Sequence, residues 1–324
     1  MQLDNIENLV LSGGGLLGIS YIGLFRYLEE YQATQQIKTV IGSSAGAILG
    51  MLFIIGYSHS QIYDKLKDMK FSEYIPITAD SLINLMRVKG VNSCSNIVQF
   101  LKNALLDKTG REDTTFRQLY ERFGIAFKIG ATNLTTSRFE LLDHTNHPDL
   151  PVYLAVKASI AIPFVFEPVI IGEYLYCDGG LCDNLPIDYV IETMDYQANT
   201  PDKPNTPDTP DTLDKPNMPD TEKKEKESSQ LKTLGIYLTN TQECINPDNY
   251  LDASIYQYLN AVLHASFLHP TLEKKAKENE KKYKIIIIEI PCDIMTFLKL
   301  HATRADIDNI IGIAYETIAK ECKY

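Results

Sequence analysis

Two glycine-rich turns, each placed between a short apolar strand and an apolar helix, constrain this chain more than any other feature. The first occupies residues 12–18 and reads Ser-Gly-Gly-Gly-Leu-Leu-Gly after the apolar segment 8–11. The second occupies residues 42–46, reads Gly-Ser-Ser-Ala-Gly, and joins the strand-like segment 38–41 to an apolar stretch at 45–57. Two successive strand–turn–helix units indicate parallel strands connected by helices. The sequence therefore predicts an α/β fold with a mostly parallel central sheet and helices on both faces.

The remaining ordered sequence keeps alternating between helical and strand-like periodicity. Apolar residues on all sides of 45–57 predict a buried helix. Further helices are predicted at 16–31, 60–69, 95–106, 115–122, 152–158, 250–268, 270–281 and 303–320. Further strands are predicted at 125–133, 138–143, 165–171, 173–177, 233–238 and 284–290, with a turn at Gly172.

Residues 199–229 differ in composition from the rest of the chain. They hold 6 of the 15 prolines, 8 acidic residues and 5 lysines, in an imperfect Thr-Pro-Asp repeat with almost no large apolar side chain. Such a segment cannot bury enough apolar surface to offset the entropy lost on ordering. We therefore expect one α/β domain over residues 1–324, interrupted by a disordered loop at 199–229. That loop is either a tolerated expansion or a tether for a partner.

Charge and cysteine content exclude several classes of protein. With 31 basic and 42 acidic residues, the formal net charge is −11. Nucleic-acid-binding proteins usually present a basic face, so we expect no nucleic-acid partner. Simple electrostatic capture by anionic membranes is also disfavoured, although a local basic patch remains compatible with this charge. Six cysteines in 324 residues, none spaced as C-x-x-C, favour neither a disulfide scaffold nor a structural zinc site.

Nothing in the sequence predicts a membrane span or a secretion signal. The longest apolar stretch, 45–57, is about 13 residues long, which is too short to cross a bilayer. The first residues, Met-Gln-Leu-Asp-Asn-Ile-Glu, carry acids where a signal peptide carries bases. We therefore expect a cytoplasmic protein, peripheral wherever it meets a membrane.

The first glycine-rich turn is suited to holding an anion. Glycines between a strand and a helix let the backbone turn tightly and expose N–H groups at a helix N-terminus. Gly13, Gly15 and Gly18 fit the G-x-G-x-x-G pattern of dinucleotide binding, but residues 33–38 lack the acid that this pattern requires. No Gly-Lys-Ser/Thr follows, which argues against a P-loop. An oxyanion hole and a plain tight turn remain as interpretations.

The second turn is a Gly-x-Ser-x-Gly motif centred on Ser44. Small residues on both sides of the serine permit a sharp strand-to-helix turn that lifts the hydroxyl out of the sheet. The N-terminus of the following helix favours developing negative charge. A serine that only caps the helix is the alternative interpretation. In this strand–turn–helix context we interpret Ser44 as a nucleophile.

A nucleophilic serine requires a base, and a third motif offers one. Asp178, in Tyr-Cys-Asp-Gly-Gly, stands at the end of the predicted strand 173–177. Asp-Gly is also a common turn pair, so alone this motif indicates little. With the two earlier motifs, we interpret Asp178 as the general base.

Taken together and in this order, the three motifs resemble those of the patatin-like phospholipases. The resemblance covers residues 8–190 and includes 158–164, Ala-Ser-Ile-Ala-Ile-Pro-Phe, which is similar to the family's Ala-Ser-x-Ala-x-Pro stretch. It implies the family's three-layer fold and hydrolysis of acyl esters in phospholipids or lysophospholipids at a membrane or micelle surface. Beyond the predicted loop, the chain matches the family only in its α/β character.

The resemblance also implies which residues act. Ser44 would be the nucleophile and Asp178 the base of a dyad that needs no histidine, metal or cofactor. The implied oxyanion-hole residues are Gly13, Gly14, Gly15 and Gly18. The implied supporting glycines are Gly42, Gly46, Gly179 and Gly180. The chain departs from the family at Leu17, where an arginine or lysine usually precedes the last glycine of the loop and adds to the positive field.

Two other functions are compatible with the sequence. In an α/β-hydrolase esterase with a Ser-Asp-His triad, the histidine would follow Asp178, as His264, His269 and His301 do. Ser44 comes too early for that fold, in which several strands normally precede the nucleophile. A catalytically weak or silent module that binds lipid or membrane is the second alternative, favoured by Leu17. The sequence fixes neither the oligomeric state nor the need for a protein activator.

An apolar cluster between residues 71 and 88 lies beside two cations. It contains Phe71, Tyr74, Ile75, Leu82, Ile83, Leu85, Met86 and Val88, next to Arg87 and Lys89. A cap over the site, an interfacial patch and ordinary core packing are the three interpretations of this cluster.

Overall fold

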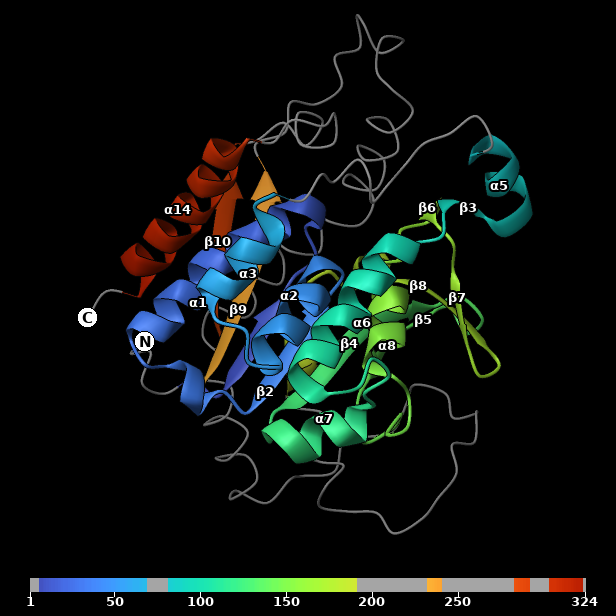
Figure 1. The fold of residues 1–324 in the computed structure, drawn as a ribbon, viewed down its shortest axis with the longest axis horizontal. Coiled ribbons are helices and arrows are strands. Elements are labelled where there is room, and N and C mark those ends of the chain that lie inside the picture. The colour runs from blue at the N-terminus through green and yellow to red at the C-terminus, as the bar shows by residue number, and fades with distance from the viewer. Residues whose placement is uncertain (1–5, 69–80, 191–231, 241–282, 292–302, 323–324) are drawn as a thin grey trace, which may run out of the picture.

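The computed structural model describes residues 6–68, 81–190, 232–240, 283–291 and 303–322 (Figure 1). The predicted loop at 199–229 and the predicted helices at 250–268 and 270–281 lie outside these described residues. The division of the chain into a single domain therefore stays a prediction.

A mixed sheet of eight strands forms the centre of the molecule, in the order β10-β9-β1-β2-β4-β8-β7, with β5 also paired to β4. Five strands run parallel: β10 (Lys284–Ile290), β9 (Thr233–Asn240), β1 (Asn8–Leu11), β2 (Thr39–Ser43) and β4 (Ala126–Asn133). Three strands at one end are antiparallel to their neighbours: β5 (Arg138–Leu142), β7 (Val169–Ile171) and β8 (Tyr174–Asp178). The predicted α/β fold with a central sheet and flanking helices is confirmed.

Helices form a layer over one face of this sheet (Figure 1). The α-helices are α1 (Tyr21–Glu30), α2 (Ala45–Ile54), α3 (His59–Leu66), α5 (Ser81–Val88), α6 (Ser95–Thr109), α7 (Phe116–Phe123), α8 (Val152–Ser159) and α14 (Arg304–Glu321). The 3-10 helices are η2 (Gly15–Ser20), η3 (Thr34–Gln36), η4 (Gly179–Leu181) and η5 (Ile187–Val190). Two short strands, β3 (Gly90–Asn92) and β6 (Phe164–Phe166), pair in a separate small sheet.

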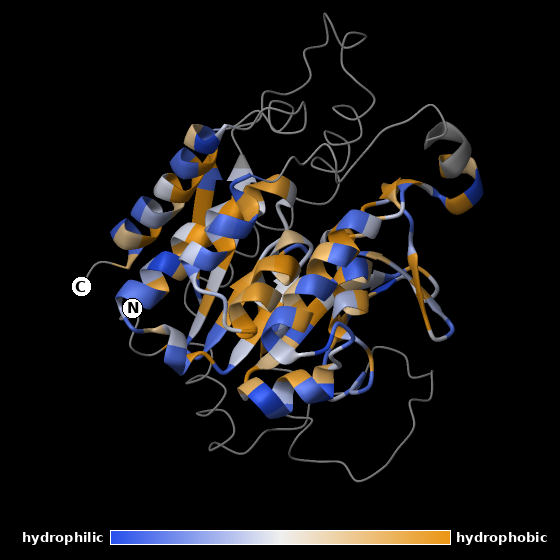
Figure 2. Cartoon of the chain, in the orientation of Figure 1, coloured by the Kyte–Doolittle hydropathy of each residue, from blue (hydrophilic) through white to orange (hydrophobic). Residues whose placement is uncertain are grey.

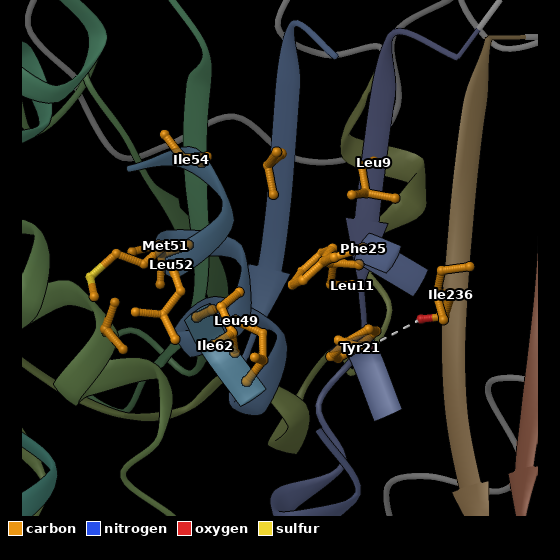
Figure 3. Packing of buried hydrophobic residues seen from close by; sticks show 14 of the residues in the cluster. Leu9, Leu11, Tyr21, Phe25, Leu49, Met51, Leu52, Ile54, Ile62 and Ile236 are labelled. Atoms are coloured by element: carbon orange, nitrogen blue, oxygen red, sulfur yellow. Dashed lines mark hydrogen bonds between the residues drawn. The ribbon is translucent and has the colours of Figure 1, made fainter. Parts of the chain in front are cut away.

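The core follows the alternation of side chains along the strands. Leu9 and Leu11 of β1 pack into the large cluster beneath α1 and α2, whereas Val10 packs into a small cluster on the opposite face with Ile187 of η5. Helix α2 is apolar over its whole length, as Figure 2 shows in orange, and most of its side chains are buried. In Figure 3, Leu49 and Leu52 of this helix lie among the buried side chains of the large cluster.

Two sequence predictions need correction in detail, and a third is tested at one described residue. The helix predicted at 16–31 begins as the 3-10 helix η2, because the tight glycine turn precedes it and Gly15 has a φ of +54°. The strand predicted at 165–171 is two strands, β6 and β7, separated at Pro168, which has no N–H to donate to a ladder. Of the cluster between residues 71 and 88, Met86 is exposed, and residues 69–80 lie outside the described chain.

The pairing of strand β4 with its neighbours brings the ends of β2 and β8 together. Gly130 of β4 pairs with Ser43 of β2 and with Leu141 of β5, so β2 and β5 lie on opposite edges of β4. The next residue, Ala131, pairs with β5 and with Asp178 of β8. Strands β2 and β8 therefore share one edge of β4. They run in opposite directions, and their last residues meet there end to end.

Two helix glycines near the contact between α1 and α14 give a test of this packing. A methyl group on Gly23 would lie 2.4 Å from the carbonyl oxygen of Ile311, whereas one on Gly312 would have no atom within 4 Å. We expect Gly23→Ala to lower the free energy of unfolding by about 1–3 kcal/mol through overpacking. Gly312→Ala should raise it by about 0.5–1 kcal/mol, because alanine has the higher helix propensity. Urea unfolding measures both; equal effects would contradict the close α1–α14 contact.

Candidate active site

Ser44 stands on a strained turn between β2 and α2. Its backbone has φ 51° and ψ −119°, a conformation that costs free energy for any residue with a side chain. Gly42 and Gly46 make the turn possible. A Cβ on Gly42 would lie 2.5 Å from the carbonyl oxygen of Gly46, and one on Gly46 would lie 2.3 Å from that of Leu11. The two glycines predicted to support the motif therefore let α2 approach β1 and β2.

A buried serine from another element holds this turn. The N–H of Ser44 donates to Oγ of Ser159 at 2.9 Å, and that hydroxyl donates to the carbonyl oxygen of Gly130 at 2.6 Å. Ser159 is the last residue of α8 and is fully buried. Ser159, the serine of the Ala-Ser-x-Ala-x-Pro stretch, thus connects the strained turn at Ser44, called the elbow below, to strand β4.

Ser44 and Asp178, predicted from two distant motifs, are in direct contact. The Ser44 hydroxyl donates to Oδ2 of Asp178 at 2.7 Å, across a sequence separation of 134 residues. The other carboxylate oxygen, Oδ1, accepts the N–H of Gly180 at 2.7 Å. Each of the two residues has an exposed fraction of 7%, so the pair is almost completely buried.

Burial changes the acidity of Asp178. Removal of the carboxylate from water raises the pKa of Asp178 to about 6, while the hydrogen bonds from Ser44 and Gly180 act in the lowering direction. Gly179 keeps the loop tight, because a Cβ there would lie 2.4 Å from the carbonyl oxygen of Gly130. A Cβ on Gly180 would lie 3.0 Å from Oδ1 of Asp178. The two glycines after the aspartate therefore permit close contact with β4 and with the carboxylate.

The predicted oxyanion glycines take different places in the loop. The N–H of Gly13 donates to the carbonyl oxygen of Asn184 at 3.2 Å, and Gly18 packs so closely on Ala45 that a Cβ would lie 2.8 Å from its methyl group. Gly15 has a φ of +54° and is exposed. Within the described part of the chain, no acceptor is found for the N–H groups of Gly14 and Gly15. These two N–H groups are thus available to a ligand.

Asn184 is a site residue that sequence reasoning missed. Its Nδ2 donates to the carbonyl oxygen of Gly13 at 3.2 Å, so side chain and backbone together hold the start of the glycine loop. Its Oδ1 is the atom nearest to the position of a Cβ on Gly13 or on Gly180. Asn184 therefore joins the loop that carries Asp178 to the glycine loop. The signal available in the sequence was the polar pair Asp-Asn before Leu-Pro, shortly after Asp-Gly-Gly.

The described histidines take part in other contacts. Nδ1 of His59 lies 2.6 Å from Glu29, His144 stacks on Tyr120 at a centroid distance of 4.0 Å, and His147 contacts Asn146. His264, His269 and His301, the candidates for a triad, lie outside the described residues. Leu17, at the position where a cation was expected, is buried in the large apolar cluster.

The described residues contain neither a candidate metal site nor a candidate membrane-spanning helix. In those ranges no three histidine, cysteine, aspartate or glutamate side chains gather as a metal would require. Over the same ranges, no helix combines the length and apolarity needed to cross a membrane.

Comparison with known families agrees with this geometry. The family model of patatin-like phospholipases matches residues 9–191, which is more than half of the chain. The chain belongs to the patatin-like phospholipase family. The matched range ends just after Asn184 and contains both members of the Ser44–Asp178 pair. The predicted resemblance is therefore confirmed.

Several curated proteins of known name are related to this patatin-like chain. Probable lipid hydrolase 463L of Invertebrate iridescent virus 6 is 30% identical over 188 residues, which are 57% of this chain and 63% of that protein. Lysophospholipase NTE1 of Kluyveromyces lactis is 29% identical over 179 residues, 55% of this chain but 11% of the yeast protein. The chain thus spans less than two thirds of the length of these relatives.

A solved structure shares the fold. VipD from Legionella pneumophila superposes with a TM-score of 0.55 at 16% sequence identity, covering 98% of this chain and 67% of VipD. At this identity the likeness concerns the fold alone. It agrees with the central sheet and flanking helices described above.

The raised pKa of Asp178 predicts how stability depends on pH. The folded state holds this proton up to about pH 6, whereas the unfolded chain releases it near 3.9, so stability falls as the pH rises between these values. Asp178→Asn removes that loss. We expect the variant to exceed wild type by about 1–3 kcal/mol at pH 8 and to match it near pH 4. Urea titrations at both pH values measure this; a difference that grows toward pH 4 would contradict it.

Proposed function

We propose that this protein is a serine acyl hydrolase that releases fatty acid from phospholipids or lysophospholipids. The observation that supports this most strongly is the hydrogen bond of 2.7 Å from the Ser44 hydroxyl to Asp178. It joins a serine on a strained elbow to a buried carboxylate that has the proton affinity of a base. Family membership and the names of the relatives support a lipid ester as the substrate.

The first chemical step follows from the contact between the two side chains. Asp178 accepts the proton of the Ser44 hydroxyl while Oγ forms a bond to the ester carbonyl carbon. A carboxylate of ordinary pKa near 3.9 is a poor base at neutral pH. Its pKa of about 6 brings proton transfer closer to the operating pH. Asp178 then donates the proton to the departing alcohol, and water, activated by the same carboxylate, hydrolyses the acyl-enzyme.

The developing oxyanion requires donors that are already in place. We assign this role to the N–H groups of Gly14 and Gly15, which have no acceptor within the described residues. Gly13 and Gly18 shape the loop instead, through Asn184 and Ala45. The N-terminus of α2, directly after Ser44, adds a favourable dipole. Removal of one oxyanion donor typically costs about 2.7–4 kcal/mol of transition-state stabilisation.

The direct contact also bears on the alternatives. In a triad, a histidine stands between serine and aspartate and passes the proton. Here the Ser44 hydroxyl reaches the carboxylate without an intermediate group, which favours a dyad. A silent lipid-binding module would have no need for a strained elbow or a buried acid. Both devices cost stability, so their presence favours catalysis.

Neighbouring serines provide a matched test of the nucleophile. Oγ of Ser43 is buried and has no hydrogen-bond partner among the described residues. We expect Ser44→Ala to lower kcat for lysophospholipid hydrolysis at least about 10³-fold, as loss of a nucleophile does. Ser43→Ala should keep kcat within about threefold, because it only removes an unsatisfied hydroxyl. Fatty-acid release measures both variants. Equal activities would disprove the assignment of Ser44.

A pH profile tests the base. We expect kcat/KM on a soluble short-chain ester to fall about tenfold per pH unit below about 6, because the protonated carboxyl cannot accept the serine proton. Above that pH the rate should reach a plateau. In Asp178→Asn, the residual rate should be low and without this inflection. An unchanged inflection in the variant would assign the titration to another group.

A further inference from the structure

A short segment connects the buried pair to the surface. Its first residue, Ser159, accepts the N–H of Ser44 at 2.9 Å, and the carbonyl oxygen of Ala161 accepts the N–H of Asp178 at 3.0 Å. Three residues later Phe164 has an exposed fraction of 54%. A large apolar side chain is thus exposed at the outer end of a segment whose inner end holds both members of the candidate dyad.

The backbone forces Phe164 outward. The N–H groups of Val165 and Phe166 both donate to the carbonyl oxygen of Ile162, at 3.1 and 2.9 Å, and both of these side chains are buried. Phe164, between them and this tight turn, has a φ of +69°. A bulky residue rarely adopts that conformation. Such strain is kept where the surroundings over-determine it, which happens frequently at ligand contacts.

Helix α5 brings a second exposed apolar side chain to the same place. Phe164 is the register partner of Gly90 in the small sheet, and Gly90 packs tightly, because a Cβ there would lie 2.3 Å from Phe166. Helix α5 ends at Val88, two residues before Gly90. In its last turn Met86 has an exposed fraction of 77%, and Arg87 and Lys89 are exposed beside it. We call Met86, Arg87, Lys89 and Phe164 the rim patch.

The figures agree with this arrangement. In Figure 1, β6, β3 and α5 adjoin one another at the edge of the molecule, on the side of β7 and β8 and away from β9 and β10. Figure 2 shows hydrophobic colouring on β6 and on the described end of α5.

The rim patch is basic although the chain is acidic. Arg87 and Lys89 are the charged residues of 81–92, with Asp80 the nearest acid before them, and Lys157 is the charged residue of 150–166, which lies between Asp149 and Glu167. The first acid after Phe164 is Glu167, which is half-buried beyond β6. The exposed charges next to Met86 are thus positive, although the net charge of the whole chain is −11. An anionic surface would attract this region and repel most others.

We propose that the rim patch docks the protein on bilayers that contain anionic phospholipid. Phe164 and Met86 would enter the interface, and Arg87 and Lys89 would contact the headgroups. Membrane interfaces bind protein surfaces that combine exposed apolar side chains with flanking cations. Docking there would bring the segment 159–164, whose inner end contacts Ser44 and Asp178, close to the lipid. This inference rests on the proposed function for its purpose, but binding can be measured without catalysis.

The experiment is co-sedimentation with vesicles of ether-linked lipids, which an acyl hydrolase cannot degrade. One set contains phosphatidylcholine alone and the other contains phosphatidylserine as well. The apolar variant is Met86→Gln with Phe164→Asn, since asparagine tolerates positive φ. The charge variant is Arg87→Gln with Lys89→Gln. The control is Leu106→Gln, an apolar residue of α6 that has an exposed fraction of 51%.

We expect wild type and the control to bind the anionic vesicles equally, and more tightly than phosphatidylcholine alone. The apolar variant should lose at least about tenfold in partitioning. The charge variant should lose about tenfold or more on anionic vesicles and little on neutral ones. All variants should hydrolyse a soluble short-chain ester as wild type does and keep its thermal midpoint.

Several results would overturn the docking proposal. These are a wild type that does not bind anionic vesicles, an apolar variant that binds as tightly as wild type, or a charge variant with undiminished binding. Self-association through the patch, seen as a dimer that the apolar variant abolishes in the absence of lipid, would also overturn it. Failure of wild type to hydrolyse the soluble ester would count against the proposed function alone, because sedimentation does not depend on catalysis.

Discussion

Strand β4 is the element on which the arrangement of the site depends. One edge of β4 pairs with β2 as far as Gly130 and with β8 from Ala131 onward. Because β2 and β8 approach this point from opposite directions, Ser44 and Asp178 meet although 134 residues separate them. The same residue, Gly130, accepts a hydrogen bond from Ser159, which in turn holds the N–H of Ser44. One strand therefore sets the positions of the elbow, the carboxylate and the residue that supports them.

Burial of Asp178 has opposing effects on stability and on chemistry. A carboxylate removed from water destabilises the folded protein wherever it is ionised, and the hydrogen bonds that it accepts from Ser44 and Gly180 offset part of this cost. The same burial raises its pKa to about 6, which makes the carboxylate a stronger base than one in water. The strained backbone at Ser44 adds a second local cost. The large apolar cluster under α1 and α2 provides the stability that permits both.

The sequence predicted the parts of the site that local chemistry determines. Glycine-rich turns after strands identified the loop at 12–18 and the turn that carries Ser44, because few residues other than glycine allow such turns. The Asp-Gly-Gly motif at the end of a strand identified Asp178. Sequence could not reveal that β8 is antiparallel to β4, since strand direction depends on pairing with distant residues. It also missed Asn184, whose role exists only because two loops far apart in the chain come together. Similarly, the separation of β6 from β7 at Pro168 depends on β6 pairing with β3, a partner too short to predict.

The end-to-end meeting of β2 and β8 also has a consequence for timing. During synthesis, Ser44 leaves the ribosome 134 residues before Asp178, a delay of roughly 7–27 s at about 5–20 residues per second. Until β8 pairs with β4, the elbow serine has no carboxylate beside it. Contacts between residues so distant in sequence form late in folding, because chain closure must precede them. A nascent or partly folded chain would therefore contain the proposed nucleophile without its proposed base, so that the proposed reactivity toward lipids would arise only with completion of the sheet.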